Sequence, residues 1–261
     1  MASFIYRDES ARPVTGIEDL LGRASGITKD GRVYFRGQAD IDWGLTPSIC
    51  REYWHAGKKV RFTRDDEIRL FQRFRRRAYI HFQRVQTRWE TLFLARHYGL
   101  PVRLIDWSEN PLVALFNASD FVREEDLPDG AIWAMTGRGK GRHAVDVFGD
   151  DDPFSVEGVK IVHPMAISQR LVAQGGIFTI HDPWKKPDLV DHGGEEMPDE
   201  FLDIGQITRW RVRREDKGKF LGDLDRMGVN QLNLYPDLEN LATGLQDGIV
   251  REAIYREKEG G

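Results

Sequence analysis

Three short segments place polar residues and glycines inside apolar stretches, a pattern suited to binding an anionic ligand. In the first, Phe35-Arg36-Gly37-Gln38, an arginine ends an apolar strand pattern. Burial of an unpaired guanidinium is costly, so Arg36 must form an ion pair or reach a ligand. Its planar fork suits a pyrophosphate or a carboxylate, and Gly37 lets another backbone or a ligand come close. The two interpretations are a structural ion pair and a phosphate clamp.

The second segment runs from His97 to Ser108 and threads polar residues through apolar ones. Asp106 can pair with Arg103 or orient His97, and Ser108 or Asn110 can cap the helix that follows. The free N–H groups at the start of that helix form a natural anion site. A buried polar network with a helix cap explains the same residues without a ligand.

The third segment, residues 169–181, reads as a helical turn, a Gly-Gly break and a strand. Arg170 and Gln174 lie four residues apart, so they can share one helix face. At the junction, Gln174 can present its amide to a ribose or a base, or it can simply cap a tight turn. The two glycines do not form the dinucleotide fingerprint, which requires G-x-G-x-x-G after a strand.

Other motifs of known chemistry are missing from the sequence. It contains no P-loop, no G-x-S-x-G and no H-E-x-x-H, and its seven histidines are scattered, so we expect no metal site. The single cysteine, Cys50, excludes an intrachain disulfide and a cysteine-based zinc site. The arginine-rich stretch 64–88 can grip the phosphates of a nucleic acid. Its alternative is a solvated helix face whose charge Asp65, Asp66 and Glu67 partly offset.

Composition limits the class of protein. The chain has 261 residues, of which 40% are hydrophobic and 11% aromatic, enough for a substantial core and too many for a disordered chain. A net charge of −4 excludes a globally basic nucleic-acid coat protein. Apolar runs are too short to span a bilayer, and residues 1–8 lack a signal-peptide pattern. We therefore expect a soluble, cytoplasmic protein that does not use a membrane as partner.

The periodicity of apolar residues predicts an α+β fold. We expect one domain with central, mostly antiparallel strands and flanking helices. The expected helices cover residues 15–25, 65–83, 89–97, 110–122 and most of 217–256. The expected strands cover residues 32–37, 130–135, 159–162, 177–181 and 208–212, and a long surface loop covers 182–203.

Taken together, the segments resemble the FRG domain family, which is named for the tripeptide Phe35-Arg36-Gly37. The resemblance includes His97-Tyr98-Gly99-Leu100-Pro101-Val102-Arg103-Leu104-Ile105-Asp106-Trp107-Ser108, and later Arg170…Gln174-Gly175-Gly176-Ile177-Phe178-Thr179 and Leu224-Asp225-Arg226-Met227-Gly228. The family usually has threonine where this chain has Val102 and Ser108. The resemblance implies an FRG domain over 15–245, an N-terminal extension over 1–14 and a C-terminal helical tail over 246–261.

The order of the motifs is also similar to that of ADP-ribosyltransferase-like domains. This similarity implies an NAD-binding enzyme that transfers ADP-ribose or hydrolyses NAD, acting as a bacterial toxin or a phage-defence effector. Arg36 would clamp the pyrophosphate, His97 would bond a ribose hydroxyl, and Tyr98 would stack on nicotinamide. The implied catalytic residues are His97, Asp106 and Gln174, and the implied ligand contacts are Arg36, Gly37, Gln38, Tyr98, Arg103, Ser108 and Arg170. No late Glu-x-Glu precedes a strand, so the assisting carboxylate is open among Asp106, Glu195 and Glu196.

Two further functions fit the same residues. A non-catalytic module would bind a nucleotide or a phosphorylated nucleic-acid end through Arg36, Arg103 and the helix-start donors, extended by the arginine-rich helix. A structural or partner-binding domain would use the motif as an internal polar network. Release of nicotinamide from NAD separates the enzyme from both.

Overall fold

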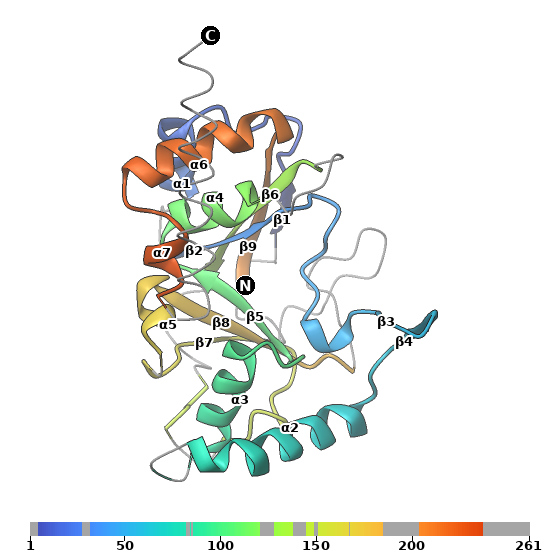
Figure 1. Ribbon diagram of the computed structural model, residues 1–261. Coiled ribbons are helices and arrows are strands. Elements are labelled where there is room, and N and C mark those ends of the chain that lie inside the picture. Colours follow the sequence, from blue (N-terminus) through green and yellow to red (C-terminus); the bar gives the residue numbers. More distant parts are fainter. Residues whose placement is uncertain are drawn as a thin grey trace.

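The computed structural model describes residues 5–27, 32–81, 84, 86–120, 128–137, 145–148, 151–166, 168–184 and 204–236. Its centre is a seven-stranded sheet with the order β1-β9-β6-β2-β5-β8-β7 (Figure 1). All neighbouring strands are antiparallel except β1 and β9, which are parallel. The predicted α+β fold with mostly antiparallel strands and flanking helices is confirmed.

The strands of the sheet are β1 (Ile5–Asp8), β2 (Val33–Gln38), β5 (Leu104–Ser108), β6 (Gly130–Gly137), β7 (Val159–Val162), β8 (Gly176–His181) and β9 (Ile204–Val212). A separate hairpin pairs β3 (Tyr53–His55) with β4 (Lys58–Val60). The helices are α1 (Ile17–Ile27), α2 (Arg64–Ala78), α3 (Arg88–His97), α4 (Pro111–Ser119), α5 (Gln169–Ala173), α6 (Lys217–Arg226) and α7 (Gln231–Leu234). None of these described helices is long and apolar enough to cross a membrane.

Helix α4 lies unusually close to the sheet because two glycines face it. A Cβ on Gly37 of β2 would lie 1.9 Å from the carbonyl oxygen of Ala114, and one on Gly130 of β6 would lie 2.1 Å from that of Ala118. Figure 1 shows α1, α4 and α6 stacked over the β9-β6-β2 part of the sheet. The apolar residues between them form one buried core, which includes Phe35.

Helices α2 and α3 cover the other end of the sheet, where β5, β8 and β7 lie. The rings of Phe93 in α3 and Phe178 in β8 stack with centroids 5.3 Å apart. Phe71 of α2 packs edge-on against Phe154 at 4.8 Å. These rings belong to a second buried cluster, so α2 and α3 are held to the sheet by aromatic packing.

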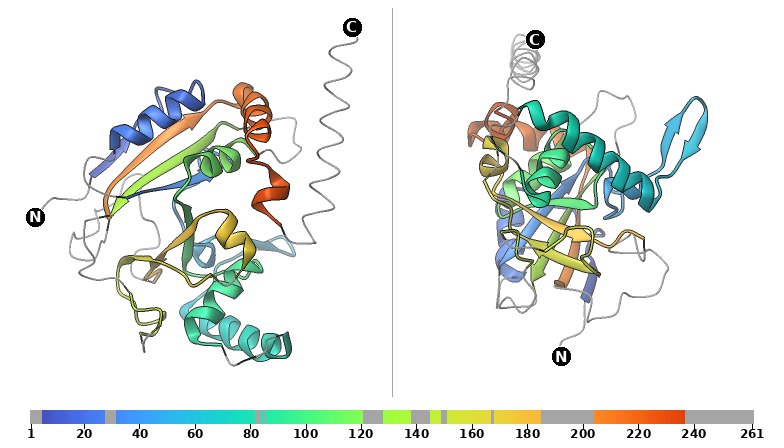
Figure 2. Two further views of the ribbon diagram at one scale, coloured as in Figure 1. Left: turned by 90° about the vertical axis from the view of Figure 1, so that its left-hand side faces the viewer. Right: turned by 90° about the horizontal axis from the view of Figure 1, so that it is seen from below.

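The two parts of the sheet meet at a weak junction between β2 and β5. Only Phe35 and Ser108 pair there, whereas β2 pairs with β6 along its whole length from Val33 to Gln38. The left view of Figure 2 shows β5 turning away from β2. Backbone groups along the inner edges of both strands are therefore not used by a regular ladder.

Most predicted elements are present, with differences at their ends. The helix expected over 65–83 ends at Ala78 and continues as a 3-10 turn to His81, and β5 was not predicted as a strand. Residues 5–8, placed in an N-terminal extension, form β1 and pair with β9. The tail 246–261 and all but the first three residues of the loop 182–203 lie outside the described residues.

Candidate functional site

Arg36 and Asp106 meet where β2 and β5 diverge. The Nη1 group of Arg36 donates a 2.9 Å hydrogen bond to the backbone carbonyl of Asp106 and lies 3.5 Å from its Oδ2. The Nε–H of Arg36 is buried and has no hydrogen-bond partner among the described residues. A buried guanidinium with an unused donor is energetically unfavourable, which makes Arg36 the first candidate for a ligand contact.

Arg96, in the last turn of α3, is the principal partner of Asp106. Its Nε donates to both carboxylate oxygens, at 3.0 and 3.1 Å, and its Nη2 donates to Oδ2 as well. The helix that carries it begins with a capping box between Thr87 and Glu90 and ends before Gly99, which has a φ of +78°. These signals fix where α3 ends and thereby place Arg96 against β5.

Two more arginines add positive charge to this cluster. Arg51 follows the 3-10 turn Ser48–Cys50, and its Nε donates to the carbonyl of Thr46 at 3.3 Å. Arg170 of α5 lies over the ring of Tyr235, 4.4 Å from its centroid. We call Arg36, Arg51, Arg96 and Arg170, with Asp106 between them, the arginine cluster.

The pKa values report how strongly these groups interact. Burial alone would raise the pKa of Asp106, but the charge and hydrogen bonds of Arg96 and the charge of Arg36 lower it to about 2, with Arg170 acting in the same direction. Burial, with the charges of Arg96 and Arg51 acting in the same direction, lowers the pKa of Arg36 to about 10 despite the opposing effect of Asp106. At neutral pH Arg36 is therefore charged and Asp106 is ionised, and this one carboxylate stands among several guanidinium groups.

The pairing of β5 with β8 brings Gln174 to Ser108, two residues after Asp106. The backbone carbonyl of Gln174 accepts a 2.6 Å hydrogen bond from the hydroxyl of Ser108, and its side-chain amide donates to the carbonyl of Leu234 at 3.2 Å. The Ser108 hydroxyl also accepts from the backbone N–H of Asn110 at 2.9 Å. Ser108 thus ties the end of β5 to the turn before β8. Arg36, Asp106 and Gln174 therefore lie on, or just before, three neighbouring strands.

Gly37 and Gln38 serve the packing of the sheet. The backbone of α4 packs directly against Gly37, which leaves no room there for a side chain. Gln38 is buried, and its side chain accepts from the indole N–H of Trp133 and donates to the carbonyl of Gly44 at 3.1 Å. Both residues therefore pack the sheet beside Arg36, and the backbone that approaches Gly37 is that of α4.

Arg103 lies in a closed ion pair away from the arginine cluster. Its Nε and Nη2 donate to the two carboxylate oxygens of Glu67 at 2.8 and 2.6 Å, and the two side chains are only 1% and 3% exposed. The indole of Trp184 also donates to Glu67, at 3.0 Å. Arg103 was one of two partners considered for Asp106, with His97 as the other; the structure pairs Arg103 with Glu67, and Asp106 with Arg96 and Arg36.

His97 and Tyr98 follow Arg96 directly. Their rings pack edge to face with centroids 4.9 Å apart, and 69% of Tyr98 is exposed. The two other acids considered for the site, Glu195 and Glu196, lie outside the described residues.

A buried histidine behind the cluster was missed by the sequence analysis. The Nε2 of His181 is 2.9 Å from the hydroxyl of Thr179, which accepts a 3.0 Å hydrogen bond from the indole of Trp107. Burial lowers the pKa of His181 to about 3, and the charges of Arg103 and Arg36 act in the same direction. This histidine is therefore neutral at physiological pH and belongs to the support of the site.

Arg51, Arg96 and Tyr235 were missed as well. Arg96 stands one residue before the motif that drew attention to His97, and its signal was the single acid, Asp106, inside an apolar strand. A buried carboxylate needs a cationic partner, and the last turn of the preceding helix is a favourable place for one. Arg51 and Tyr235 lie far from the motif in sequence and gave no comparable signal.

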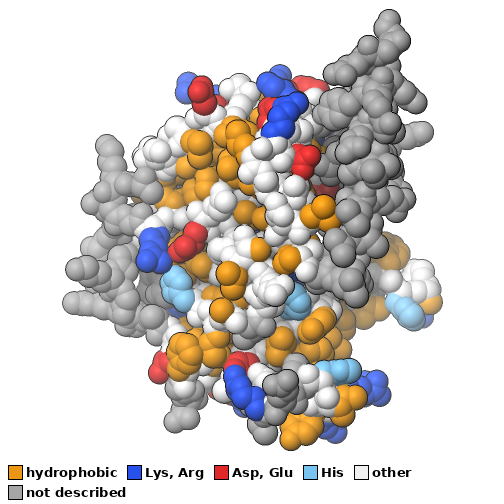
Figure 3. Space-filling model, turned by 60° about the vertical axis from the view of Figure 1, so that its left-hand side comes forward, with side chains coloured by type: hydrophobic (Ala, Val, Ile, Leu, Met, Phe, Trp, Pro, Cys, Tyr) orange, Lys and Arg blue, Asp and Glu red, His pale blue; other side chains and the backbone are white. Residues whose placement is uncertain are grey.

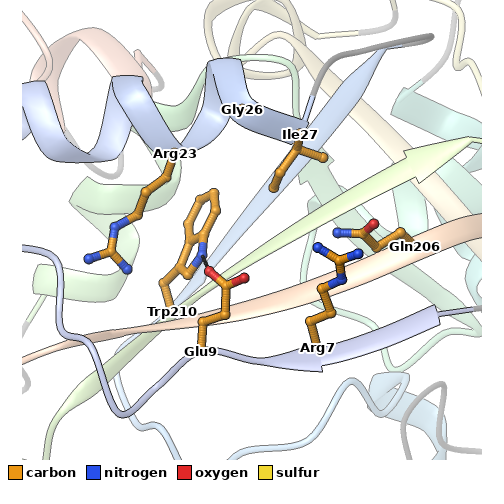
Figure 4. Close-up of a pocket in the computed structure, with 7 residues that line it drawn as sticks. All are labelled: Arg7, Glu9, Arg23, Gly26, Ile27, Gln206 and Trp210. Atoms are coloured by element: carbon orange, nitrogen blue, oxygen red, sulfur yellow. Dashed lines mark hydrogen bonds between the residues drawn. The ribbon is translucent and has the colours of Figure 1, made fainter.

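A cavity of about 470 Å³ lies elsewhere, between α1, the edge strand β1 and its neighbour β9 (Figure 4). None of its lining residues is one that the sequence predicted: Arg7, Glu9, Arg23, Gly26, Ile27, Gln206 and Trp210. The Nη groups of Arg23 bond Asp19 and two backbone carbonyls, and Glu9 accepts from the indole of Trp210 at 2.9 Å. Within the described residues, no group of three His, Cys, Asp or Glu side chains could hold a metal ion.

Comparison with protein families identifies part of the chain. Residues 31–126 match the family model of the FRG domain. Neither the curated proteins nor the solved structures give a match. The matched segment contains Arg36, Arg51, Arg96 and Asp106, whereas Arg170 and Gln174 follow it in the chain.

Proposed function

We propose that this FRG-domain protein binds the pyrophosphate of a dinucleotide in the arginine cluster, and that the dinucleotide is NAD. The observation that carries the proposal is the excess of positive charge there, with four arginines around one ionised carboxylate. Guanidinium groups bind phosphate oxygens through paired hydrogen bonds, so the two phosphates would balance most of the positive charge that Asp106 leaves. The unused Nε–H of Arg36 supplies one donor for this purpose.

The surroundings of the cluster fit the remaining parts of a dinucleotide. Tyr235 presents a partly buried ring beside Arg170, and its hydroxyl donates to the Asn117 side chain at 2.9 Å. An aromatic ring next to a cation suits stacking with a base. Gln174 lies two chain positions from the start of β8 and gives this side of the cluster an amide for a ribose hydroxyl.

The reaction proposed for this site is hydrolysis of the bond between nicotinamide and ribose. The bond from C1′ to the nicotinamide nitrogen breaks, and its electron pair leaves with nicotinamide. A water oxygen then bonds to C1′, and one proton passes to solvent. The ribose carries positive charge in the transition state, which a carboxylate stabilises, and Asp106 is the acid that the described part of the cluster offers.

The pairing of Asp106 with Arg96 and Arg36 sets a limit on this role. Two cations at hydrogen-bond distance or close to it neutralise much of the field of the carboxylate. Asp106 therefore serves best when the phosphates draw Arg36 toward themselves. This dependence links binding of the pyrophosphate to the stabilisation of charge on the ribose.

Incubation with NAD, followed by quantification of nicotinamide and of bound NAD, tests the proposal. We expect release by the wild type, loss of both binding and release in Arg36→Ala, and loss of release with retained binding in Asp106→Asn. Arg73→Ala, on the exposed side of α2, is the control and should match the wild type. Binding without release would reject hydrolysis and leave a binding module. Absence of binding at millimolar NAD would reject the proposal.

A further inference from the structure

Helix α2 turns a row of arginines away from the protein. Arg69, Arg73 and Arg76, spaced four and three residues apart, share one helix face with Arg77 beside them, and all four are exposed. The opposite face carries Phe71, which is buried in the core. We call these four arginines the arginine ridge.

The ridge lies in a stretch of strongly positive charge. From Arg69 to Arg88, both included, the sequence has seven arginines and neither aspartate nor glutamate. Arg69 pairs with Asp66, but Arg73, Arg76 and Arg77 form no ion pair within the described part of the chain. The chain as a whole carries a net charge of −4, so this local excess is not a general property of its surface.

Hydrophobic side chains adjoin the ridge at the end of α2. Tyr79 is 59% exposed and Ile80 is 82% exposed, in the 3-10 turn that continues the helix. Figure 3 shows basic and hydrophobic side chains side by side at the lower end of the molecule, where α2 lies in Figure 1. The surface thus combines cations with an exposed ring, the two features that bind phosphates and bases.

We propose that the arginine ridge binds the phosphodiester backbone of a nucleic acid. At a rise of about 1.5 Å per residue the ridge is about 12 Å long, enough to contact several successive phosphates. Guanidinium groups without a carboxylate partner are available for bidentate contacts with phosphate oxygens. Tyr79 extends the site to an unpaired base by stacking.

The packing of α2 argues against a membrane as the partner. A basic amphipathic helix that binds a bilayer buries its apolar face among the lipids. In this protein that face is already occupied, because Phe71 packs on Phe154 and Glu67 is paired with Arg103. Of α2 itself, the charged face remains for a partner, and charge supplies most of the binding to a nucleic-acid backbone.

This inference is independent of the NAD site. The ridge residues are exposed on α2, and none of them belongs to the arginine cluster. Either proposal can therefore fail while the other stands.

Fluorescence anisotropy with labelled 20-nucleotide RNA, single-stranded DNA and duplex DNA tests the ridge over a range of salt concentrations. The test variant is Arg73→Glu with Arg76→Glu. The control, Arg214→Glu with Lys219→Glu, makes the same change of charge at exposed positions near α6. We expect the test variant to lose at least about tenfold in affinity and to reduce the salt slope by about two, and the control to stay within about threefold of the wild type.

Tighter binding of RNA or of DNA identifies the natural nucleic acid, and either result supports the proposal. Three results would overturn it: no binding at about 50 mM salt, equal losses in both variants, or tighter binding to poly-glutamate or anionic vesicles than to any nucleic acid. Unchanged melting temperatures show that the variants are folded. Arg73→Gln with Arg76→Gln repeats the test if charge reversal disturbs folding.

Discussion

The chemistry of Arg36 depends on how its neighbours share one negative charge. Asp106 accepts three hydrogen bonds from Arg96 and lies 3.5 Å from a nitrogen of Arg36. Arg96 therefore holds most of the carboxylate, and Arg36 keeps a donor unused. A guanidinium in this position is prepared for an anionic ligand without the cost of first breaking a strong ion pair.

The buried His181 predicts how the stability of the protein depends on pH. Its pKa is about 3 in the folded protein and about 6.5 when exposed, so the unfolded chain binds a proton between these values and the folded protein does not. The free energy of unfolding should therefore fall as the pH is lowered from 6.5 toward 3, by up to about 1.4 kcal/mol per pH unit from this group.

Urea unfolding of the wild type and of His181→Gln at several pH values between 7 and 4.5 measures this contribution. The variant keeps a hydrogen-bonding side chain but does not titrate, so its stability should depend less on pH in that range. Parallel curves for the two proteins would show that His181 is not the group responsible.

At the scale of elements, the close approach of α4 to β2 and β6 determines where Arg36 lies. Gly37 follows Arg36 directly, and a Cβ there would lie 1.9 Å from one backbone atom of α4 and 2.7 Å from another. Backbone atoms cannot yield as a flexible side chain can. The helix would have to move away from β2, which would loosen the core beneath α4.

Gly37→Ala should therefore destabilise the protein by about 1–3 kcal/mol, the cost of forcing extra volume into a packed core. Gly22→Ala is the control, because nothing lies within 4 Å of a Cβ at that position of α1. It should leave stability unchanged or raise it by about 0.5–1 kcal/mol, since alanine favours a helix over glycine. Denaturant unfolding measures both, and equal effects would contradict this account of the packing.

At the scale of the whole molecule, the sheet brings together residues that are far apart in the sequence. Arg36, Asp106 and Gln174 come from β2, β5 and the turn before β8, and these three strands are neighbours. Only one residue pair joins β2 to β5, so little regular ladder connects the two halves of the sheet there. The arginine cluster lies at this junction and takes its members from segments on both sides.

The sequence predicted the helices and strands better than it predicted which side chains pair in the candidate site. Apolar periodicity located α1, α3, α4 and most strands, because local pattern decides where a helix or strand forms. It did not predict β5, whose side chains divide between two buried clusters: Leu104 packs on one side and Trp107 on the other.

The assignment of arginines required the fold. Arg103 and Arg96 are both close to Asp106 in sequence, and residue type alone does not separate them. In the structure, Arg103 forms an ion pair with Glu67 of α2, and Arg96 forms one with Asp106. Such choices depend on tertiary packing, because packing decides which carboxylate lies within reach of each buried cation.

Isothermal titration calorimetry with ADP-ribose and with adenosine tests the central claim most directly, because only the first ligand carries a pyrophosphate. We predict that the wild type binds ADP-ribose at least about tenfold more tightly than adenosine, that Arg36→Gln removes this preference, and that Arg73→Gln retains it. Equal affinity of the wild type for the two ligands, or an unchanged preference in Arg36→Gln, would contradict the assignment of the arginine cluster as a pyrophosphate site.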